Sequence, residues 1–597
     1  MTLKKRNYTL FDVITITFRA SPILCSIKLF IAFFTGILPA IQVVYTATFI
    51  ERSIAVAQGT GYTSEVYMPL IVLLVLVASS LILPGSINQM LSVRLKIELF
   101  KRFRLAITKH RAKLAYYYVE DNDTYDLIMR VSDDPGTNMK NSFDHLMWLV
   151  QMMLNIVSVI ALLFFHVIGV AFIILAVSVP ILYFAAKNGK LNYQGYTDAR
   201  KFVRRYEYLG EVLTQRDTVN ERSVFGFSEP VSEKYQGLFD EAKHILLKTF
   251  RQIFKRTVIA DVATIFLSIL IAVLMIRPVL GGNLTFPLYV ALVGAIFALI
   301  QYSARRIPNQ VLRLSSTSQY MRDLTKFCAL ETIEGTDLPP SRNLPEFKQI
   351  SFKNVHFNYP GLDYEVLKGV SFDIAPGKHY AIVGANGAGK STIIKLLTGL
   401  YTNYTGEIKI NDRELKTIPQ DELKAYFSVV HQDFARYSIT LEENIALGAG
   451  VNIDEKMPNT QTAYDLLNID EIAAELPYGK QTILGKAVAD GQDISGGQWQ
   501  RVVLARAAVN FAPVKILDEP TAALDPVSES NIYQRFEEIS QGTTTIFISH
   551  RLGSTKLADE IIVIDGGLMA ERGTHEELMA NKGLYAEMYD SQRSWYQ

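Results

Sequence analysis

Long stretches without charged side chains dominate the first half of the sequence and most constrain what it can fold into. They are Leu29–Ile50, Val66–Val93, Leu146–Ala186, Thr257–Ile276 and Pro287–Ala304. Among Asp, Glu, Lys and Arg, they contain Asp261 alone. A helix needs about 20 apolar residues to cross a bilayer, so Leu146–Ala186 is long enough for two crossings, with a turn near His166 and Gly169. We therefore predict an all-α membrane domain of six transmembrane helices.

Composition agrees with a membrane protein and excludes several other classes. Hydrophobic residues make up 49% of the chain, mostly before residue 305, and the net charge is +1. No basic arm is present, which argues against a nucleic-acid partner. The apolar run that follows Lys4, Lys5 and Arg6 is too long for a cleaved signal peptide and predicts a retained helix. Cys25 and Cys328 form no Cys-x-x-Cys pair, which argues against disulfides and thiolate metal sites.

The basic residues near the predicted spans set their orientation. Clusters precede the first span and follow the second, fourth and sixth, at Lys4–Arg6, Arg94–Arg104, Lys187–Arg200 and Arg305–Arg306. The opposite side carries only Arg52 and Arg277. Because positive residues accumulate on the cytoplasmic side, both termini are predicted to be cytoplasmic. The long, charged and helical connections Arg94–His145 and Lys187–Arg256 should then extend the spans into the cytoplasm.

A Gly- and Pro-rich break separates two domains. Gly335, Pro339 and Pro345 lie in it, and short β-branched runs alternating with helical patterns follow. That alternation is typical of an α/β domain with a mainly parallel sheet. We predict a membrane domain at 1–333, a linker at 334–346 and an α/β P-loop NTPase domain at 347–597.

Residues 384–391 read as a phosphate-binding loop. The loop follows a predicted strand, Tyr380–Val383, and opens a predicted helix, Ser391–Leu400, which is the context that this motif requires. Its glycines let backbone N–H groups face the phosphates of ATP, and the helix N-terminus adds positive charge. Lys390 should bridge the β- and γ-phosphates, and Ser391 should bind Mg²⁺. The predicted nucleotide-binding residues here are Gly384, Asn386, Gly387, Ala388, Gly389, Lys390, Ser391 and Thr392.

A second motif, Val514–Glu519, is an apolar strand that ends in two acids. Ligands of α/β sheets bind at the carboxyl ends of strands. Asp518 is therefore predicted to hold Mg²⁺ and Glu519 to polarise the attacking water as general base. Lys515 inside the strand is predicted to reach the surface from a strand end.

With these motifs in order, nearly the whole chain resembles the ATP-binding cassette (ABC) transporters. The resemblance implies adenine stacking by Tyr359 and contacts of Gln432 with Mg²⁺ and the attacking water. It also implies a γ-phosphate contact by His550. Ala522–Asp525 matches the family's D-loop, and Ile494–Gln498 matches its signature Leu-Ser-Gly-Gly-Gln, with Ile in place of Leu.

The signature implies that two chains work together. Ser495, Gly496, Gly497 and Gln498 are predicted to open a helix and to form a second anion site. In the family, this motif covers the nucleotide that the partner subunit holds. One membrane half and one cassette therefore imply a half-transporter, which would act as a homodimer or pair with a paralogue.

The membrane domain is similar to exporters of this family. We predict cytoplasmic coupling turns near Asp121–Met129 and Glu221–Phe227. The run Gly485–Arg501 is similar to the bacterial branch that exports peptides and antimicrobials, which implies a bacterial cell membrane. With few residues before the first span, no leader-processing peptidase is expected. Polar candidates for the substrate cavity are Gln42, Gln151, Asn155, Asp261 and Gln301; Asp261 could instead be interfacial.

Alternative functions remain to be weighed. A lipid flippase or a siderophore importer could use the same scaffold, so the substrate could be a peptide, a drug-like molecule or a lipid. A membrane regulator with an idle cassette is disfavoured because Glu519 and His550 are both present. A soluble cassette ATPase of DNA maintenance is disfavoured by the six spans.

Overall fold

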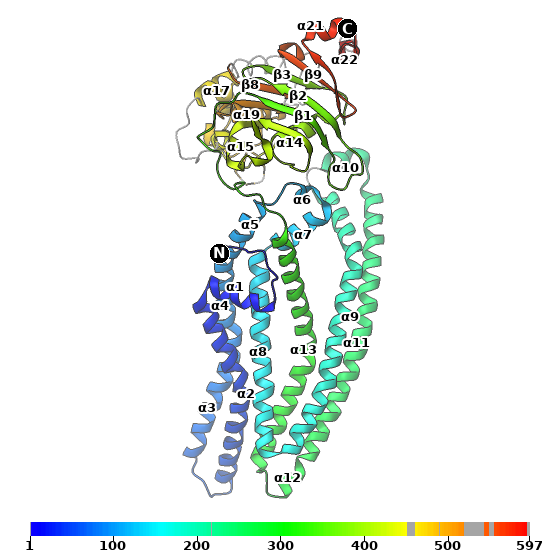
Figure 1. Ribbon diagram of the computed structural model, residues 1–597. Coiled ribbons are helices and arrows are strands. Elements are labelled where there is room, and N and C mark those ends of the chain that lie inside the picture. Colours follow the sequence, from blue (N-terminus) through cyan, green and yellow to red (C-terminus); the bar gives the residue numbers. More distant parts are fainter. Residues whose placement is uncertain are drawn as a thin grey trace. The chain divides into compact units, whose positions relative to one another are not determined.

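The computed structural model describes residues 2–593 except 216–217, 450–459, 487, 489, 519–541 and 549–553. The side chains of 170–171, 173–186, 190, 193, 260, 264, 300–309 and 311–312 are also outside this description. Contacts divide the chain into two compact units (Figure 1). The first holds residues 1–110 and 126–330, and the second holds residues 111–125 and 331–597. The short segment 111–125 thus groups with the cassette by its contacts, although the predicted membrane domain runs through it.

The first unit consists of helices. Their bounds are α1 (Leu10–Ala20), α2 (Pro22–Ala57), α3 (Ser64–Ile82), α4 (Asn88–Leu99), α5 (Leu105–Arg111), α7 (Asn122–Ser132), α8 (Pro135–His166), α9 (Ile168–Thr214), α10 (Val219–Phe225), α11 (Ser228–Leu274), α12 (Ile276–Leu280) and α13 (Phe286–Ala329). The π-helical turns η1 (Leu83–Ile87) and η2 (Phe100–Arg104) join α3, α4 and α5 into one continuous helix. α9 and α11 run side by side along most of their length (Figure 1).

Within the described residues, four helical stretches are long and apolar enough to cross a membrane. They are Pro22–Ala57, Ser64–Arg111, Pro135–His166 and Ser228–Leu280, and Phe286–Leu299 is a shorter apolar helix. α8 ends at His166 and α9 begins at Ile168, which confirms the predicted turn between the two halves of Leu146–Ala186. The first half of α9 falls on side chains outside the description, so the count of six spans stays a prediction.

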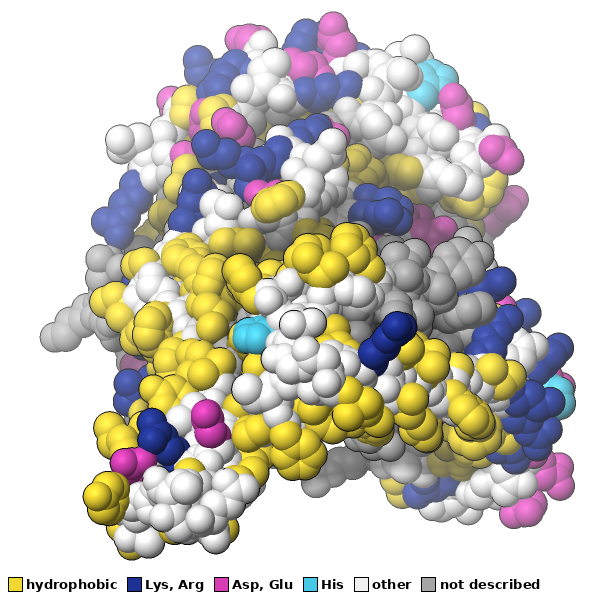
Figure 2. Space-filling model, turned by 90° about the horizontal axis from the view of Figure 1, so that it is seen from below, with side chains coloured by type: hydrophobic (Ala, Val, Ile, Leu, Met, Phe, Trp, Pro, Cys, Tyr) yellow, Lys and Arg dark blue, Asp and Glu magenta, His cyan; other side chains and the backbone are white. Residues whose placement is uncertain are grey.

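On the face shown in Figure 2, hydrophobic side chains gather over the described part of this helical unit. Leu81, Phe165, Ile259 and Phe266 are each at least 70% exposed on it. A water-soluble domain rarely exposes so large an apolar surface, whereas lipid tails would cover it. Inside the unit, α2, α8, α11 and α13 share an apolar core that includes Val43, Leu163, Ile271 and Leu292.

A buried polar cluster joins α2, α4 and α8. Lys28 is 1% exposed, and its ammonium lies 2.8 Å from the Asp144 carboxylate. The same ammonium donates hydrogen bonds to Asn88 Oδ1 at 2.9 Å and to Ser92 Oγ at 2.6 Å. Burying a lysine is tolerable only when its charge is paired and its protons are accepted, and these partners meet both needs.

The second unit is built on two sheets. The strands are β1 (Ile350–Phe357), β2 (Leu367–Ile374), β3 (His379–Val383), β4 (Thr405–Ile410), β5 (Arg413–Glu414), β6 (Phe427–Val430), β7 (Val514–Asp518), β8 (Thr544–Ile548), β9 (Glu560–Asp565) and β10 (Leu568–Gly573). One sheet has the antiparallel order β2-β1-β4-β5 and the other the order β10-β9-β3-β8-β7-β6. In the second sheet only the β9–β10 pair is antiparallel, which confirms the predicted mainly parallel α/β domain.

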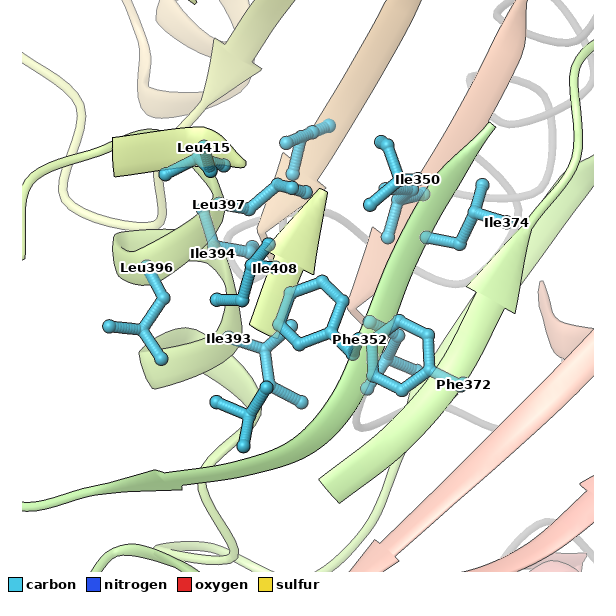
Figure 3. Close-up of a cluster of buried hydrophobic side chains, with 14 of the residues drawn as sticks. Ile350, Phe352, Phe372, Ile374, Ile393, Ile394, Leu396, Leu397, Ile408 and Leu415 are labelled. Carbon is cyan, nitrogen blue, oxygen red and sulfur yellow. The ribbon is translucent and has the colours of Figure 1, made fainter. Parts of the chain in front are cut away.

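Helices pack against these sheets. The α-helices described in this unit are α6 (Tyr117–Glu120), α14 (Lys390–Leu397), α15 (Gln420–Tyr426), α16 (Leu441–Ala446), α17 (Thr460–Leu466), α18 (Ile469–Glu475), α19 (Gly496–Ala508), α21 (His575–Asn581) and α22 (Leu584–Arg593). Figure 3 shows Ile393, Ile394 and Leu397 of α14 among strand residues that include Phe352 and Ile408. This packing fixes the helix that carries the phosphate-binding loop.

One prediction about the parallel sheet is wrong. Lys515 does not reach the surface but is 3% exposed. It lies in β7, an interior strand between β6 and β8, and all residues of β7 are buried, so both faces of the sheet are covered here and the side chain has no path to water. The loss of hydration lowers the pKa of Lys515 to about 8.

Candidate functional site

The parallel register brings the predicted motifs to one edge of the sheet. Ile382 of β3 pairs with Ile548 of β8, and Ile548 pairs in turn with Asp518 of β7. The phosphate-binding loop therefore begins level with Asp518, at the carboxyl edge where α/β sheets bind ligands.

The loop conformation depends on its glycines. Gly384 has φ +152°, and a Cβ there would lie 2.0 Å from the carbonyl oxygen of Ile564. Gly389 caps α14 with φ +107°, and a Cβ there would lie 2.7 Å from Leu367. Both the backbone angles and the close approaches exclude larger residues. The loop therefore wraps tightly before α14 begins.

Lys390 is held against this loop. Its side chain is 5% exposed, and its ammonium donates to the carbonyl oxygens of Gly384 at 2.9 Å and Ala385 at 3.0 Å. Ser391 and Thr392 follow in the first turn of α14. A cation and a helix N-terminus thus converge on the loop, an arrangement that attracts anions.

A cavity of about 720 Å³ opens over the loop, and its size is usual for a small-molecule site. Predicted site residues that line it are Tyr359, Asn386, Gly387, Gly389, Lys390, Ser391, Thr392 and Gln432. Gly384 and Ala388 shape the loop without lining the cavity. Sequence reasoning missed the walls formed by Leu362, Tyr364, Glu365, Val366, Lys368, Gly566 and Gly567. These residues belong to no recognisable motif and reach the site only through the fold.

Tyr359 is fixed at the wall of this cavity. Its ring packs edge-on against Phe357 at a centroid distance of 5.0 Å and against Tyr401 at 5.3 Å. Its hydroxyl lies 2.9 Å from the Thr392 hydroxyl. A rigid aromatic face beside the loop could stack on a flat base.

The residues present suit a hard cation. Asp518 ends β7 and is 7% exposed, and Ser391 lines the cavity. Carboxylate and hydroxyl oxygens are donors that Mg²⁺ accepts. The remaining predicted groups near this edge, Glu519, His550 and the segment Ala522–Asp525, lie outside the described residues.

The signature segment opens α19 as predicted. Ser495 is the N-cap: its hydroxyl accepts a hydrogen bond from the N–H of Gln498 at 3.2 Å, and Gln498 Oε1 accepts one from the Ser495 N–H at 2.9 Å. This capping box holds the helix N-terminus in shape while Ser495 and Gly496 stay exposed. Among the described residues that line the cavity over the loop, none belongs to 494–498.

Comparisons with known proteins agree with this architecture. Residues 367–522 match the family model described as ABC transporter. The subtilin transport ATP-binding protein SpaT of Bacillus subtilis is 28% identical over 94% of this chain and 90% of its own length. An ATP-dependent lipid A-core flippase of Photobacterium profundum is 29% identical over 81% of each chain. Among solved structures, a bacterial Atm1-family ABC exporter with ATP bound matches with a TM-score of 0.80 and 21% identity, over 95% of this chain and 99% of that one.

An apolar helical unit joined to a P-loop nucleotide-binding unit defines a membrane transport ATPase. Residues 367–522 form an ABC transporter domain, and the chain as a whole has the fold of ABC exporters. It is a membrane protein whose ATPase activity is coupled to transport.

Proposed function

We propose that this chain is one half of a dimeric ABC exporter, in which each nucleotide is held between the phosphate-binding loop of one subunit and the signature of the other. The observation that supports this is the separation of the two motifs. Residues of the phosphate-binding loop line the cavity. The capped N-terminus of α19, which carries the signature, is exposed and is not among the described residues that line the cavity. A second copy of the chain, or a paralogue, would supply the missing wall.

Within each site, different side chains bind the nucleotide and activate the attacking water. Lys390 and the N–H groups of the loop bind the phosphates, and Tyr359 stacks on adenine. Gln432 and Glu519 orient the attacking water, Glu519 accepts its proton as general base, and His550 contacts the γ-phosphate. Ser391 and Asp518, with Gln432, would hold Mg²⁺, which neutralises phosphate charge when it is bound.

The proposed topology places six spans in a bacterial cell membrane, with both termini and the cassette in the cytoplasm. The basic clusters beside the spans support it. Coupling turns would be formed near Asp121–Met129 and Glu221–Phe227. α7 and α10 occupy these places as short helices.

A cavity in the helical unit bears on the substrate. It measures about 370 Å³ and is lined by α2, α8 and α13. Gln42, Thr46 and Asn155 supply its polar groups, and its other described walls are Pro39, Val43, Val159, Val290, Ala291, Gly294, Ala295, Ala298 and Leu299. Of the predicted cavity residues, Gln42 and Asn155 line this cavity, whereas Gln151 and Asp261 do not. The side chain of Gln301 lies outside the description.

The described lining of this cavity carries amides and a hydroxyl but no charge. Amides donate and accept hydrogen bonds, so they suit a peptide-like or other neutral amphipathic molecule. A phosphorylated lipid headgroup would call for arginine or lysine instead. We therefore favour export of an amphipathic, amide-bearing substrate. Flipping of a lipid is the second candidate, and the similarity to lipid A-core flippases supports it.

The test uses the full chain purified in detergent and placed in lipid nanodiscs. Its mass and ATPase rate are measured first, and a dimer with ATPase activity is expected. A monomer that hydrolyses ATP at full rate would refute the half-transporter. Hydrophobic peptides should stimulate the ATPase, and Gln42→Leu with Asn155→Leu should abolish that stimulation. Gln89→Leu, an exposed amide elsewhere in the helical unit, is the control. Stimulation by phosphorylated lipids alone would favour the flippase.

A further inference from the structure

An ion pair ties the helix after the phosphate-binding loop to residues 111–125. Lys395 lies in α14, one turn after Ser391, and its ammonium donates to Glu120 Oε1 at 2.7 Å. Glu120 is the last residue of the short helix α6. The phenol of Tyr401 donates to the other carboxylate oxygen of Glu120. One carboxylate thus organises two residues that follow the loop.

The same ammonium sits among aromatic rings. Lys395 Nζ lies 5.1 Å from the ring centroid of Tyr359, 5.6 Å from that of Tyr116 and 5.9 Å from that of Tyr401. The ring of Tyr401 in turn packs edge-on against both Tyr116, at 5.8 Å, and Tyr359, at 5.3 Å. At these distances a cation is attracted to the ring faces. We call Glu120, Lys395, Tyr116, Tyr401 and Tyr359 the tyrosine cluster.

Both charges persist at neutral pH. Partial burial is the largest single effect and disfavours the charged Lys395, but the hydrogen bond with Glu120 and the electrostatic interactions with Glu120, Tyr359 and Tyr116 together exceed it and raise the pKa of the lysine. Burial likewise opposes ionisation of Glu120, but hydrogen bonds from Lys395 and Tyr401 outweigh it and lower the pKa of that carboxyl. The ion pair is 27% and 36% exposed, so it contributes little to overall stability. We infer that the ion pair instead fixes the orientation of the aromatic rings around it.

We propose that Lys395 and Glu120 are positioning residues for Tyr359, so that ATP affinity depends on a carboxylate in the segment 111–125. The inference rests on the proposed stacking of Tyr359 on adenine. Tyr359 is the member of the tyrosine cluster that lines the nucleotide cavity, and its place is set by Lys395 and Tyr401, which Glu120 holds. Residues 111–125 continue directly into α7. A change in the conformation of residues 111–125 would therefore alter the position of the Tyr359 ring before it altered the phosphate-binding loop.

The test compares two ligands on the purified full-length chain. ATP should bind to both the Tyr359 ring and the phosphate-binding loop, whereas inorganic tripolyphosphate should bind to the loop alone. Glu120→Gln and Lys395→Met should each raise the Kd for ATP about three- to tenfold and leave the Kd for tripolyphosphate within about twofold. Lys395→Arg should restore part of the ATP affinity. The matched controls are Glu407→Gln and Lys409→Met, from a pair at the same 2.7 Å distance in β4 that faces no part of the cluster. They should change neither Kd.

A double-mutant cycle links the effect to Tyr359. Added to Tyr359→Ala, the Glu120→Gln change should weaken ATP binding by less than about twofold, because the platform is already gone. Equal losses of ATP and tripolyphosphate, or unchanged ATP affinity in both single variants, would refute the inference. If Tyr359→Ala itself leaves ATP affinity unchanged, the stacking role fails instead. A thermal melt of each variant identifies any that simply unfolds, and Lys395→Arg then decides the case.

Discussion

The hydroxyl of Tyr359 lies 2.9 Å from the hydroxyl of Thr392. This contact joins the predicted adenine platform to the first turn of α14, directly after the phosphate-binding loop. The base and the phosphates of one nucleotide would therefore bind to two parts of the chain, Tyr359 and the start of α14, that contact each other.

Truncating Tyr359 should weaken nucleotide binding more than it slows turnover. Stacking of a base on an aromatic ring contributes about 1–3 kcal/mol, so Tyr359→Ala should raise the KM for ATP by about 5- to 100-fold with a small change in kcat. Tyr359→Phe keeps the ring and loses only the contact with Thr392, so its KM should rise less than about fivefold. Steady-state ATPase assays measure both. A lower kcat with unchanged KM would contradict stacking.

Replacing Glu519 should separate binding from hydrolysis. Glu519→Gln keeps the shape and removes the proposed general base, so ATP binding should persist while turnover falls by at least about 100-fold. Equilibrium binding of ATP and release of phosphate measure the two effects. Near-normal turnover would remove Glu519 from that role, and Glu471→Gln, an exposed acid in α18, is the control.

Breaking the Lys28–Asp144 pair should destabilise the helical unit. Lys28→Met leaves the Asp144 carboxylate with Lys140, at 3.2 Å, as its cation and with the Ser92 hydroxyl, at 3.1 Å, as a hydrogen-bond donor, and should cost about 2–4 kcal/mol. The apparent melting temperature in detergent should therefore fall. Lys101→Met, which removes a lysine that is 67% exposed, is the control and should change it little. Equal melting temperatures for Lys28→Met and wild type would show that the pair contributes nothing.

The buried Lys515 should give the cassette a distinctive dependence on pH. Its pKa is about 8 in the folded state against an ordinary value of 10.5, so the folded chain binds fewer protons between these two values. Stability therefore rises with pH across this window, and below about pH 8 the full cost of burying the charge is present. Lys515→Met removes that cost and should be more stable than wild type at pH 7.

The advantage of Lys515→Met should then shrink by up to about 1.4 kcal/mol for each pH unit between 8 and 10. Denaturant unfolding of both proteins at each pH measures this difference, in which the titration of all other groups cancels. A constant difference across the range would mean that Lys515 keeps its ordinary pKa.

Local patterns were enough to predict the four long apolar helices, the turn after His166 and the loop before α14. An uncharged run long enough for a bilayer can satisfy its backbone only as a helix. Gly384 and Gly389 adopt backbone angles that other residues avoid, so the positions of these glycines in the sequence are enough to predict the conformation of the loop. The N-cap role of Ser495 also follows from neighbours within one helical turn.

The sequence alone thus determined which segments are helices, which form the parallel sheet and which glycine-rich loop precedes α14, because these depend on bond geometry and on residues close in the chain. Only the tertiary structure decided the rest. Glu120 and Lys395 are 275 positions apart, yet their side chains share a hydrogen bond. The burial of Lys515 between two neighbouring strands is equally invisible in its own segment. Such contacts arise from the packing of whole elements against one another. No pattern within a single segment specifies which distant side chain each of its residues will contact.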